Sequence, residues 1–412
     1  KKQMIRLLQG DVGSGKTIVA LMSMLISLDN GYQTCLVAPT EILAFQHFKN
    51  FQENLKHLKL NISLLTGSSK ISERKRILND LRNGTLDILI GTHAVLEDNV
   101  VFKKLGFAVI DEQHKFGVKQ RSKIWKKNNP PPHILIMTAT PIPRTLTMSL
   151  YGDLDLSVID ELPPGRKDVI TVARKDKNRL KVFGFIRDQI KKGRQIYIVY
   201  PLIEESKKMD LKFLEDGYES ILKEFNSKEY SIGIVHGRMK SPNKDFEMKQ
   251  FANGKTDILV STTVIEVGVN VPNASVMIIE NAERFGLSQL HQLRGRVGRG
   301  GYDSYCILMT KDKISDDAKI RIDAMVNTND GFKISEVDLK LRGPGDILGT
   351  QQSGILDFKI ADLVEDEKIL SNASDDASFL LKNDPKLILN ENYNIRRFIL
   401  NNPLNKSWNE IG

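Results

Sequence analysis

One short segment near the start of the chain constrains the fold more than any other feature. It fits the pattern G-x-x-x-x-G-K-[ST] of a phosphate-binding loop. In such a loop the glycines let backbone N–H groups point at a β-phosphate, the lysine reaches the β- and γ-phosphates, and the last hydroxyl binds Mg²⁺. Apolar residues precede the segment as a strand would and follow it as a helix would, which argues against a flexible glycine-rich turn. The sequence therefore predicts a nucleotide site made by Gly10, Asp11, Val12, Gly13, Ser14, Gly15, Lys16 and Thr17.

The first part of the chain alternates short β-branched apolar segments with amphipathic ones. This pattern is typical of a parallel sheet covered by helices on both faces. Polar residues follow most of the apolar segments, and ligands of open α/β sheets bind where the strands end. We therefore expect the polar loops to gather at one functional edge. The predicted strands cover residues 35–38, 63–65, 87–90, 107–110 and 134–137.

Two neighbouring carboxylates, Asp111 and Glu112, end the fourth of these strands. Such a pair alone is weak evidence, because acids at a strand end are usually just solvated. Downstream of a phosphate loop in the same domain, the first acid can hold Mg²⁺ and the second can polarise an attacking water. His114 has no second His or Cys at metal-ligand spacing, so we interpret it as a hydrogen-bonding or coupling residue. The same spacing argument sets aside His47, His57, His133 and His291 as metal ligands.

The alternation of apolar and amphipathic segments is less regular between residues 151 and 170. Here Pro163, Pro164 and Gly165 disfavour a helix and add a turn. We interpret this stretch as a connection between two domains, with a boundary near residue 160. The alternation then resumes without a second phosphate loop. It predicts strands at residues 195–200, 232–235, 257–260, 276–279 and 305–309.

Arg296 and Arg299 lie three residues apart among glycines, on what should be a short helix. This spacing keeps both side chains on one face, able to reach a γ-phosphate held by a neighbouring domain. It fits equally well a basic face that touches solvent or nucleic acid. The spacing alone leaves both interpretations open.

Composition narrows the class of protein. A chain of 412 residues is long enough for two or three domains, and 60 Lys+Arg against 51 Asp+Glu suggest a polyanionic partner without proving one. The two cysteines, Cys35 and Cys306, form no C-x-x-C pattern, so neither a disulfide framework nor a zinc site is indicated and a reducing, intracellular setting is expected. The sequence shows neither an apolar stretch of membrane-spanning length nor a signal peptide. Because residue 1 is Lys and the first strand begins close to it, we expect a natural N-terminal portion to be missing.

A family resemblance emerges from the order of the motifs. Residues 10–17, 38–41, 111–114, 138–141, 261–268 and 292–299 resemble the ordered motifs of superfamily 2 helicases. Within that superfamily, segments 111–118, 140–145 and 289–299 are similar to RecG branch-migration translocases and, almost as well, to transcription-repair coupling factors. Residues 318–354 resemble the translocation motif that these two families share, a helical hairpin followed by a loop. Segments 343–345 and 358–363 look more like RecG, so the chain is identified as a RecG-type helicase core and tail without the N-terminal wedge domain.

The resemblance implies an α/β fold of two tandem RecA-like domains with parallel sheets and ATP between them. The expected parts are an ATP-binding domain at 1–160, a second RecA-like domain at 161–312, a translocation-motif hairpin and loop at 313–363, and a tail at 364–412. Lys16 and Thr17 would hold phosphates and Mg²⁺, Asp111 would coordinate that Mg²⁺, and Glu112 would activate water. Arg296 and Arg299 would act as arginine fingers, which resolves their open interpretation. Gln292, Gly268 and Asn270 would line the same nucleotide site.

The implied function is an ATP-dependent, double-stranded DNA translocase that remodels stalled forks and Holliday junctions with 3′–5′ polarity. The alternatives are the motor of a transcription-repair coupling factor and an uncoupled nucleotide-dependent DNA-binding fragment. The resemblance also implies a monomeric, cytoplasmic, nucleoid-associated bacterial protein with no membrane partner, and a single-stranded-DNA-binding protein as a partner. DNA would be held through its phosphates, with weak sequence preference and strong salt sensitivity. The candidate DNA-binding and coupling residues are Thr40, Thr66, Gly67, Thr92, His93, His236, Arg238, Thr262, Thr263, Arg321, Arg342 and Gln352.

Two positions depart from the family pattern. Asn270 stands where the family usually has an acid near the nucleotide ribose, so we expect an altered but retained nucleotide contact. Gln351 stands where the hairpin loop usually carries Arg, which puts part of the coupling contact in doubt, whereas Gln352 is kept.

Overall fold

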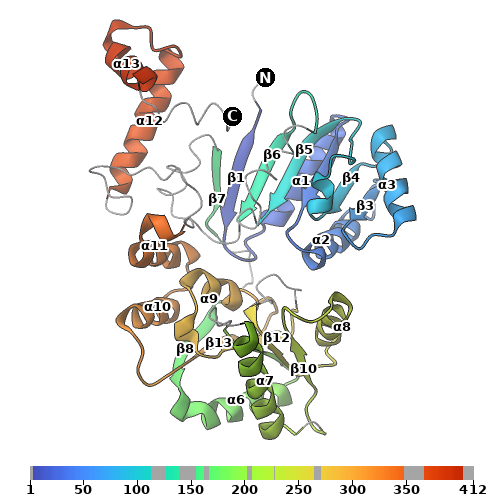
Figure 1. Cartoon of the computed structure of the whole chain (residues 1–412), viewed down its shortest axis with the longest axis vertical. Helices are drawn as coiled ribbons and strands as arrows, with labels where there is room; N and C mark the ends of the chain where they lie inside the picture. The colour runs from blue at the N-terminus through green and yellow to red at the C-terminus, as the bar shows by residue number, and fades with distance from the viewer. Residues whose placement is uncertain are drawn as a thin grey trace. The chain divides into compact units, whose positions relative to one another are not determined.

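The computed structural model describes residues 3–112, 124, 127–138, 155–161, 167–201, 207–226, 228–263, 271–347 and 366–401. The chain divides into two compact units. The first comprises Lys1–Ile142 and Asp153–Leu341, and the second comprises Pro143–Gly152 and Arg342–Gly412. Figure 1 labels the helices and strands of both units.

The first unit begins with a seven-stranded sheet in the order β3-β4-β2-β5-β6-β1-β7, whose strand pairs are all parallel. Its strands are β1 (Ile5–Gly10), β2 (Gln33–Val37), β3 (Ile62–Leu65), β4 (Ile88–Gly91), β5 (Leu105–Asp111), β6 (His133–Thr138) and β7 (Asp155–Ile159). Its helices are α1 (Lys16–Asp29), α2 (Glu41–Asn54), α3 (Ile71–Asn83) and the 3₁₀ helix η1 (His93–Leu96). The predicted parallel α/β sheet is confirmed, including all five strands foreseen in this part of the chain.

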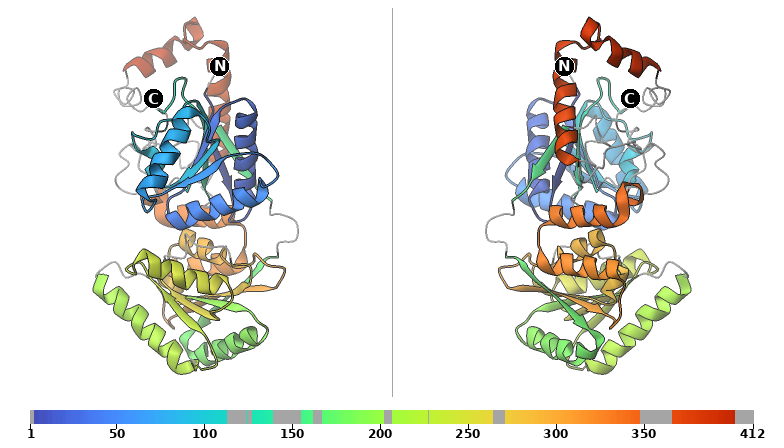
Figure 2. Two further views of the ribbon diagram at one scale, coloured as in Figure 1. Left: turned by 90° about the vertical axis from the view of Figure 1, so that its right-hand side faces the viewer. Right: turned by 90° about the vertical axis from the view of Figure 1, so that its left-hand side faces the viewer.

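Helices cover both faces of this sheet, because successive side chains of its strands enter two different cores. Leu7 of β1 packs in one core with Ile77 of α3, while its neighbour Leu8 packs in the other with Met24 of α1 and Phe51 of α2. Every residue of β2 and β4 is buried, as expected for parallel strands between two helical layers. Figure 2 shows the same molecule from two further sides.

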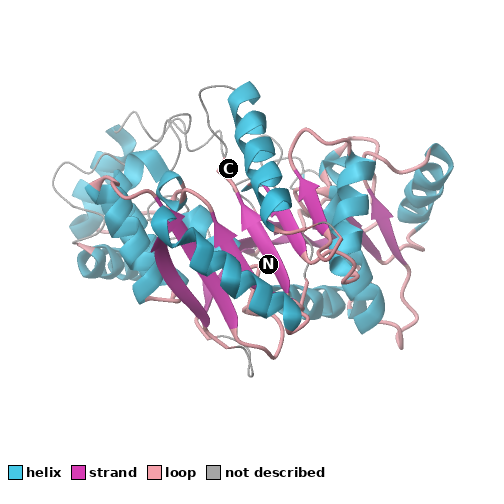
Figure 3. Ribbon diagram, turned by 90° about the horizontal axis from the view of Figure 1, so that it is seen from below, coloured by secondary structure: helices cyan, strands magenta, loops and turns pink. Residues whose placement is uncertain are grey.

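A second parallel sheet of six strands follows, in the order β10-β11-β9-β12-β13-β8. Its strands are β8 (Val169–Lys175), β9 (Gln195–Val199), β10 (Ile232–Val235), β11 (Ile258–Ser261), β12 (Ala274–Ile279) and β13 (Ser304–Thr310). Its helices are η3 (Asp176–Asn178), α6 (Arg179–Lys191), α7 (Lys207–Glu224), α8 (Ser241–Ala252), η5 (Ala282–Arg284) and α9 (Leu287–Arg294). Figure 3 shows the strands of the structure in magenta among cyan helices.

The stretch interpreted as an interdomain connection is more ordered than expected. Residues 155–159 form β7, the edge strand of the first sheet, and Val169 begins β8, the edge strand of the second. These two strands were not predicted, because each of them pairs with a neighbouring strand on one side only. Such a strand needs less continuous apolar sequence than a central strand, and none of the residues of β7 is fully buried.

Two helices follow the second sheet, in the region where a helical hairpin is expected, and their packing as a hairpin stays a prediction. α10 (Asp316–Asn327) begins at the cap residue Ser315, whose hydroxyl accepts a hydrogen bond from Ala318 N at 3.3 Å. α11 (Gly331–Ile347) is interrupted at Gly343, where φ is 72° and ψ is 165°. Ile322 and Met325 of α10 and Ile334 of α11 pack into the core of the second sheet.

The described part of the second unit continues with α12 (Glu367–Asn383), η6 (Asn390–Asn392) and α13 (Tyr393–Asn401). Asp384 holds the turn after α12, since its carboxylate accepts hydrogen bonds from Ile388 N, Leu389 N and the Asn392 amide at 2.9 to 3.0 Å. These bonds, that of Asn392 above all, lower the pKa of Asp384. Across the described residues, no helix combines the length and hydrophobicity needed to cross a bilayer.

Candidate functional site

The phosphate loop joins β1 to α1, and its glycines are required by its backbone. Gly13 and Gly15 have φ angles of 79° and 99°, a left-handed region that glycine enters without steric cost. A Cβ on Gly10 would lie 2.5 Å from the Ser14 hydroxyl oxygen, so that position also excludes a side chain. The backbone therefore curls tightly before α1 begins.

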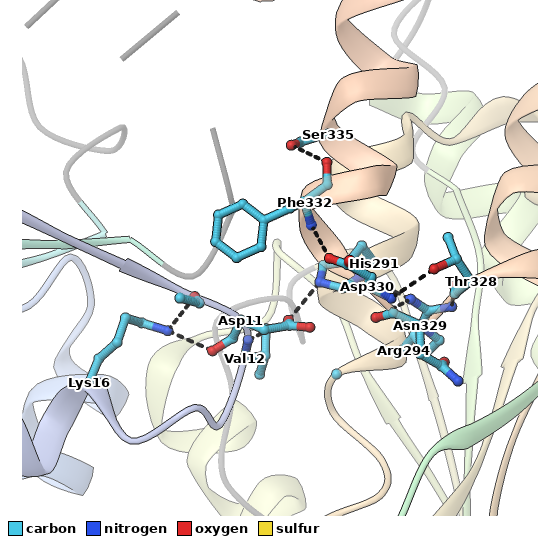
Figure 4. Close-up of polar contacts among 12 residues, drawn as sticks. Asp11, Val12, Lys16, His291, Arg294, Thr328, Asn329, Asp330, Phe332 and Ser335 are labelled. Atoms are coloured by element: carbon cyan, nitrogen blue, oxygen red, sulfur yellow. Dashed lines mark hydrogen bonds and ion pairs between the residues drawn. The ribbon is translucent and has the colours of Figure 1, made fainter. Parts of the chain in front are cut away.

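Lys16 is directed into this loop. Its side chain is 9% exposed, and its Nζ atom donates hydrogen bonds to the carbonyl oxygens of Gly10 and Asp11, both at 2.8 Å (Figure 4). The N–H groups of the first turn of α1 have no carbonyl four residues earlier within the helix, and the helix dipole adds positive potential there. Cationic and N–H donors around one loop suit a bound polyphosphate.

The buried hydroxyl group of Ser14 also suits a bound polyphosphate. Ser14 Oγ is shielded from solvent and has no hydrogen-bond partner among the described residues. Burying a hydroxyl without a partner costs free energy, which a phosphate oxygen could recover by hydrogen bonding. The loop thus fits a nucleotide both in its shape and in its donors.

The carboxylate of Asp111 lies at the end of β5 and is held by a histidine. His47 Nε2, on α2, lies 2.8 Å from Asp111 Oδ2, and the side chains are only 8% and 11% exposed. A carboxylate can only accept, so the His47 nitrogen carries the proton and donates it. This leaves the Oδ1 atom of Asp111 to face another ligand, and together with the Thr17 hydroxyl it provides the hard oxygen donors that Mg²⁺ prefers.

Glu112 adopts an unusual backbone conformation directly after this strand. Its φ angle is 52°, in the left-handed region that costs a residue with a side chain about 1–3 kcal/mol. Its N–H donates to the carbonyl of Met137 at 3.0 Å, which ties the turn to the end of β6. The strained turn fixes where the Glu112 side chain leaves the backbone.

Mg²⁺ in nucleotide sites usually keeps water and phosphate ligands beside one or two protein oxygens. Among the residues that the structure describes, no group of three or more His, Cys, Asp or Glu side chains is arranged to hold a metal. Thr17 and Asp111 offer two such protein oxygens and fit a cation that also takes phosphate ligands.

Helix α9 contacts the phosphate loop directly. His291 Nε2 lies 2.7 Å from Asp11 Oδ1, and on its other side His291 Nδ1 lies 3.1 Å from Arg294 Nη2 (Figure 4). In addition, a Cβ built on Gly295 would lie 2.7 Å from Val12 Cβ, so the turn after α9 packs closely on the loop. Spacing alone had set His291 aside, and Arg294 received no role.

Helix α9 contains Gln292, whereas Arg296 and Arg299 follow its end. The prediction that both arginines share a helical face was wrong, because α9 ends at Arg294 and both follow it in a turn. Gly298, with φ of 78°, directs the chain away from a helix. Arg299 Nε donates to the Gly295 carbonyl at 3.0 Å, which orients its guanidinium along the turn. Their roles as arginine fingers stay predictions.

The expected DNA-contact residues of the first sheet follow strand ends, but they differ in exposure. Thr40 caps α2 by accepting a hydrogen bond from Leu43 N at 3.3 Å. Thr66 and Thr92 are 5% and 2% exposed, which leaves their side chains little access to DNA. His93 is exposed and Gly67 lies in an exposed turn.

One acid ties two of these loops together. Glu41, in the first turn of α2, accepts hydrogen bonds from Ser68 N at 3.1 Å and Ser68 Oγ at 2.7 Å. The turn after β3, which carries Thr66 and Gly67, is thereby fixed beside the start of α2. The structure thus brings the two predicted loops into one surface.

In the second sheet, Arg238 is exposed, His236 and Thr263 are half-buried, and Thr262 is 3% exposed. Burial lowers the pKa of His236, while Glu215 opposes this and Lys244 and Arg238 add to it. His236 is therefore neutral at pH 7 in the protein alone.

The two described candidates after the second sheet, Arg321 and Arg342, differ in their contacts and exposure. Arg321 Nη2 donates to the carbonyl of Glu283 at 2.9 Å, so this arginine anchors α10 to η5. Arg342 in α11 is exposed. The remaining predicted positions, Gly268, Asn270, Gln351, Gln352 and His114, lie outside the described residues.

Three family models match the chain in sequence order. The DEAD/DEAH box helicase model matches residues 1–149, and the helicase conserved C-terminal domain matches residues 178–301. The model described as ATP-dependent DNA helicase RecG, domain 3, C-terminal, matches residues 328–408. The first model thus covers β1 to β6 of the first sheet, and the second covers β9 to β12 of the second sheet. The third covers α11, α12 and α13.

Relatives extend this similarity over most of the chain. ATP-dependent DNA helicase RecG of Synechocystis sp. is 52% identical over 384 residues, which are 93% of this chain and 46% of that protein. The protein of the same name from Aquifex aeolicus is 50% identical over 390 residues, 93% of this chain and 49% of that protein. The chain therefore spans about half the length of these relatives.

Solved structures agree with the fold. A structure of RecG bound to a three-way DNA junction matches with a TM-score of 0.73 and 46% identity, over 90% of this chain and 48% of that one. S. cerevisiae Dbp5 bound to RNA and ADP BeF3 matches with a TM-score of 0.57 and 19% identity, over 82% of this chain and 84% of that one. The second likeness concerns the fold alone.

Proposed function

Because the chain belongs to the RecG family of DNA helicases, we propose that it hydrolyses ATP to move along double-stranded DNA and to remodel branched DNA. The observation that carries this proposal is the 2.7 Å contact between Asp11 of the phosphate loop and His291 of α9. It places the loop of the first sheet against the segment of the second that carries Gln292, Arg296 and Arg299. A nucleotide held by the loop would therefore be bordered by elements of both sheets.

In the proposed site, the phosphate loop binds the polyphosphate. Lys16 would exchange its bonds to the loop carbonyls for bonds to phosphate oxygens, and the N–H groups of the first turn of α1 would add donors. The ammonium is already desolvated, so its attraction to an anion is stronger than in water. These donors bind and orient the nucleotide.

Thr17 and Asp111 would hold Mg²⁺, which would supply charge neutralisation on the phosphates. His47 would keep one carboxylate oxygen of Asp111 occupied, so that the other faces the cation. Glu112 would orient the attacking water from its strained turn. Each of these roles follows from the chemistry of the side chain that would perform it.

Arg296 and Arg299 would stabilise charge that develops on the transferred phosphoryl group. Arginine fingers in other NTPases contribute about 10³ to 10⁵ in rate. The close packing of Gly295 on Val12 supports this role, since it brings the turn that carries both arginines against the loop. Movement of that turn with the nucleotide state would convert hydrolysis into motion.

We further propose that DNA phosphates lie on the surface that Glu41 organises and on the exposed Arg238 and Arg342. The net charge of +9 favours a polyanion, and phosphate contacts would make affinity fall steeply with salt. The related RecG structure is bound to a three-way DNA junction, which supports a branched substrate for this chain. A 3′–5′ polarity, a monomeric state, a nucleoid location and binding to a single-stranded-DNA-binding protein stay predictions.

The test is ATP hydrolysis by the 412-residue chain with no DNA, linear duplex and a three-way junction. We expect phosphate release that rises with duplex and junction and disappears in Lys16→Ala. Junction unwinding in the same samples separates the alternatives, because hydrolysis that DNA stimulates without strand movement would identify an uncoupled fragment. Absence of any ATP hydrolysis would refute the proposal. The match to the RecG domain 3 model favours this family over a transcription-repair coupling factor.

A further inference from the structure

We propose that the edge of the second sheet at β8 binds an extended, acidic segment of a partner protein, which pairs with β8 as an additional strand. The binding surface is a groove of about 630 Å³ between β8, β13 and helix α6, which Figure 1 labels in the second sheet. The groove involves no residue of the nucleotide site and no expected DNA-contact residue, so this interaction goes beyond the proposed function.

One face of the sheet forms the floor of the groove. Val172 of β8 and Tyr305 and Ile307 of β13 belong to the core that contains α6, but Val172 and Tyr305 are only half-buried. Ile170 lies two residues before Val172, and therefore on the same face, and it is 49% exposed. Among the described residues, helix α6 thus covers the two outermost strands only in part.

One side of α6 forms the wall of the groove. Lys181, Val182 and Phe185 line it from the first two turns of the helix. The Phe185 ring packs edge-on against Tyr305, with 5.0 Å between the ring centroids and 79° between the ring planes. This contact fixes the wall relative to the floor, so the groove loses little conformational freedom when a partner binds.

The charged side chains that line the groove are all basic, namely Arg174, Lys175 and Lys181. Arg174 Nη1 donates to the Ala173 carbonyl at 2.9 Å, and Lys175 Nζ donates to the Asp312 carbonyl at 3.4 Å. Both acceptors are uncharged, so the positive charges of these side chains are not neutralised by them. A groove with an apolar floor and a basic rim suits a ligand that combines apolar and acidic groups.

The acid that follows these bases in sequence pairs with another residue. Asp176 accepts a hydrogen bond from Arg179 Nη2 at 2.7 Å. Arg179 does not line the groove. The basic rim is therefore available to acidic side chains of a partner.

Strand β8 also offers backbone groups for pairing. Among the described residues it is the last strand of its sheet, and it pairs only with β13. Alternate N–H and C=O groups of an edge strand point away from the sheet, where a further strand can bind them. Alternate side chains of that added strand would then face the groove.

The groove lies away from the other proposed sites. Val182 of α6 packs with Ile307 in one core of the second sheet, whereas Leu290 of α9 packs with Cys306 in the core on the opposite face. The expected DNA-contact residues of this sheet follow β10 and β11, which lie at the other end of the strand order from β8. A partner bound in the groove would therefore leave both of these sites accessible.

The distribution of charge and apolar surface indicates the kind of partner. The groove is apolar beside Ile170 and Val172 and basic beside Arg174 and Lys181, so it suits an extended segment whose apolar part adjoins an acidic part. A second copy of β8 is disfavoured, because like charges on neighbouring strands destabilise a sheet. DNA is disfavoured as well, because aliphatic side chains offer phosphates no hydrogen-bond donor.

Selection from a displayed peptide library, with the 412-residue chain as bait, tests this interaction. Each peptide carries a random segment of seven residues, the length of β8. We expect enrichment of segments in which apolar residues adjoin acidic ones. Fluorescence anisotropy with one labelled peptide of this set should show an affinity that falls with added salt.

Two variants in the groove and one control outside it locate the bound peptide. Lys181→Glu reverses a charge in the first turn of α6, where an acid suits the helix dipole, and it should weaken binding about tenfold. Ile170→Thr keeps a β-branched residue in the edge strand but removes apolar contact, so it should also weaken binding. Lys191→Glu, in the last turn of the same helix, is the matched control and should bind the peptide normally. The melting temperature and ATP hydrolysis of all three variants should match those of the unmutated chain.

Methylation of the peptide backbone separates strand pairing from binding through side chains alone. In an added strand, alternate N–H groups donate to β8. N-methyl groups on one alternate set of residues should therefore abolish binding, whereas the other set should tolerate them. Equal effects of the two sets would overturn strand pairing.

Four further outcomes would overturn the assignment of the groove to an acidic peptide. The first is a selection that enriches no acidic segments, and the second is a peptide affinity that Lys181→Glu and Ile170→Thr leave unchanged. Self-association of the chain that Lys181→Glu abolishes, measured by sedimentation, would identify a second copy as the occupant. A labelled single-stranded oligonucleotide that competes with the peptide would identify nucleic acid instead.

Discussion

His47 Nε2 lies 2.8 Å from Asp111 Oδ2, so a helix residue outside every predicted motif holds the carboxylate proposed to bind Mg²⁺. Both residues are buried, and the ring of His47 is steadied by an edge contact with Phe51, 6.3 Å between centroids. A histidine that occupies one oxygen of an acid directs the other oxygen. His47 therefore acts on the site through Asp111.

Replacement of His47 by Ala should weaken Mg²⁺ binding and raise the Mg²⁺ concentration needed for ATP hydrolysis. Removal of a residue that orients a metal ligand typically costs about 10- to 100-fold in metal affinity, because the ligand is free to rotate. The measurement is Mn²⁺ binding to the nucleotide-loaded protein by electron paramagnetic resonance, with ATP hydrolysis at varied Mg²⁺ alongside. His57→Ala, an exposed histidine beyond the end of α2, is the control. An unchanged metal affinity in His47→Ala would exclude the positioning role.

Replacement of Gly295 by Ala should impair ATP hydrolysis without unfolding the protein. The new Cβ would approach Val12 Cβ to 2.7 Å, so the turn after α9 must move away from the phosphate loop. We expect a loss in kcat of up to about a hundredfold, since the turn that carries Arg296 and Arg299 would be displaced by as much as about an ångström. Gly301→Ala is the matched control, because a Cβ there meets no atom within 4 Å. Equal activities of the two variants would show that the close approach is not needed.

Replacement of Arg179 by Met should lower the free energy of unfolding. Arg179 donates to both carboxylate oxygens of Glu280 at 2.7 and 2.8 Å, and the Glu280 side chain is 5% exposed. Loss of the arginine leaves a buried acid without its cation, at a cost of about 2 kcal/mol given that Arg179 itself is one-third exposed. Thermal or urea unfolding measures the loss. Arg174→Met, an exposed residue of β8, should change stability by less than about 0.5 kcal/mol.

The lowered pKa of His236 predicts a pH-dependent DNA affinity. A phosphate beside the imidazole would favour its protonated form, so DNA binding would take up a proton. Affinity should therefore rise as pH falls from the pKa of the DNA-bound imidazole to the lowered pKa of the free one, which lies below the ordinary value of about 6.5, and it should level off on both sides of this window. Fluorescence anisotropy with a duplex at constant salt measures this. In His236→Asn the rise should shrink, and an unchanged pH profile would place His236 away from the phosphates.

Most of the fold follows from local patterns. The five strands predicted in each half are present because central parallel strands, buried on both faces, must be apolar without interruption. The edge strands β7 and β8 were not predicted, because a strand that pairs on one side only needs less continuous apolar sequence than a central strand. The arginine turn was misjudged as helical because the left-handed backbone of Gly298 depends on packing, where a Cβ would approach Val169 to 2.9 Å.

The phosphate loop and the acids that end β5 were identified from sequence because their chemistry requires fixed residue types at fixed spacing. Gly13 and Gly15 have backbone conformations that glycine adopts readily, and the motif records that requirement within a few residues. The sequence by itself determined the conformation that these glycines adopt and the acids at the end of β5, and from them it predicts a nucleotide site.

Only the tertiary structure decided which distant side chains hold these groups. His47 meets Asp111 across 64 residues, and His291 meets Asp11 across 280. Neither contact leaves a periodic or spacing signal, because hydrogen bonds between elements depend on how helices dock at the sheet edges. The residue types of the site were therefore readable along the chain, whereas their partners arose from packing.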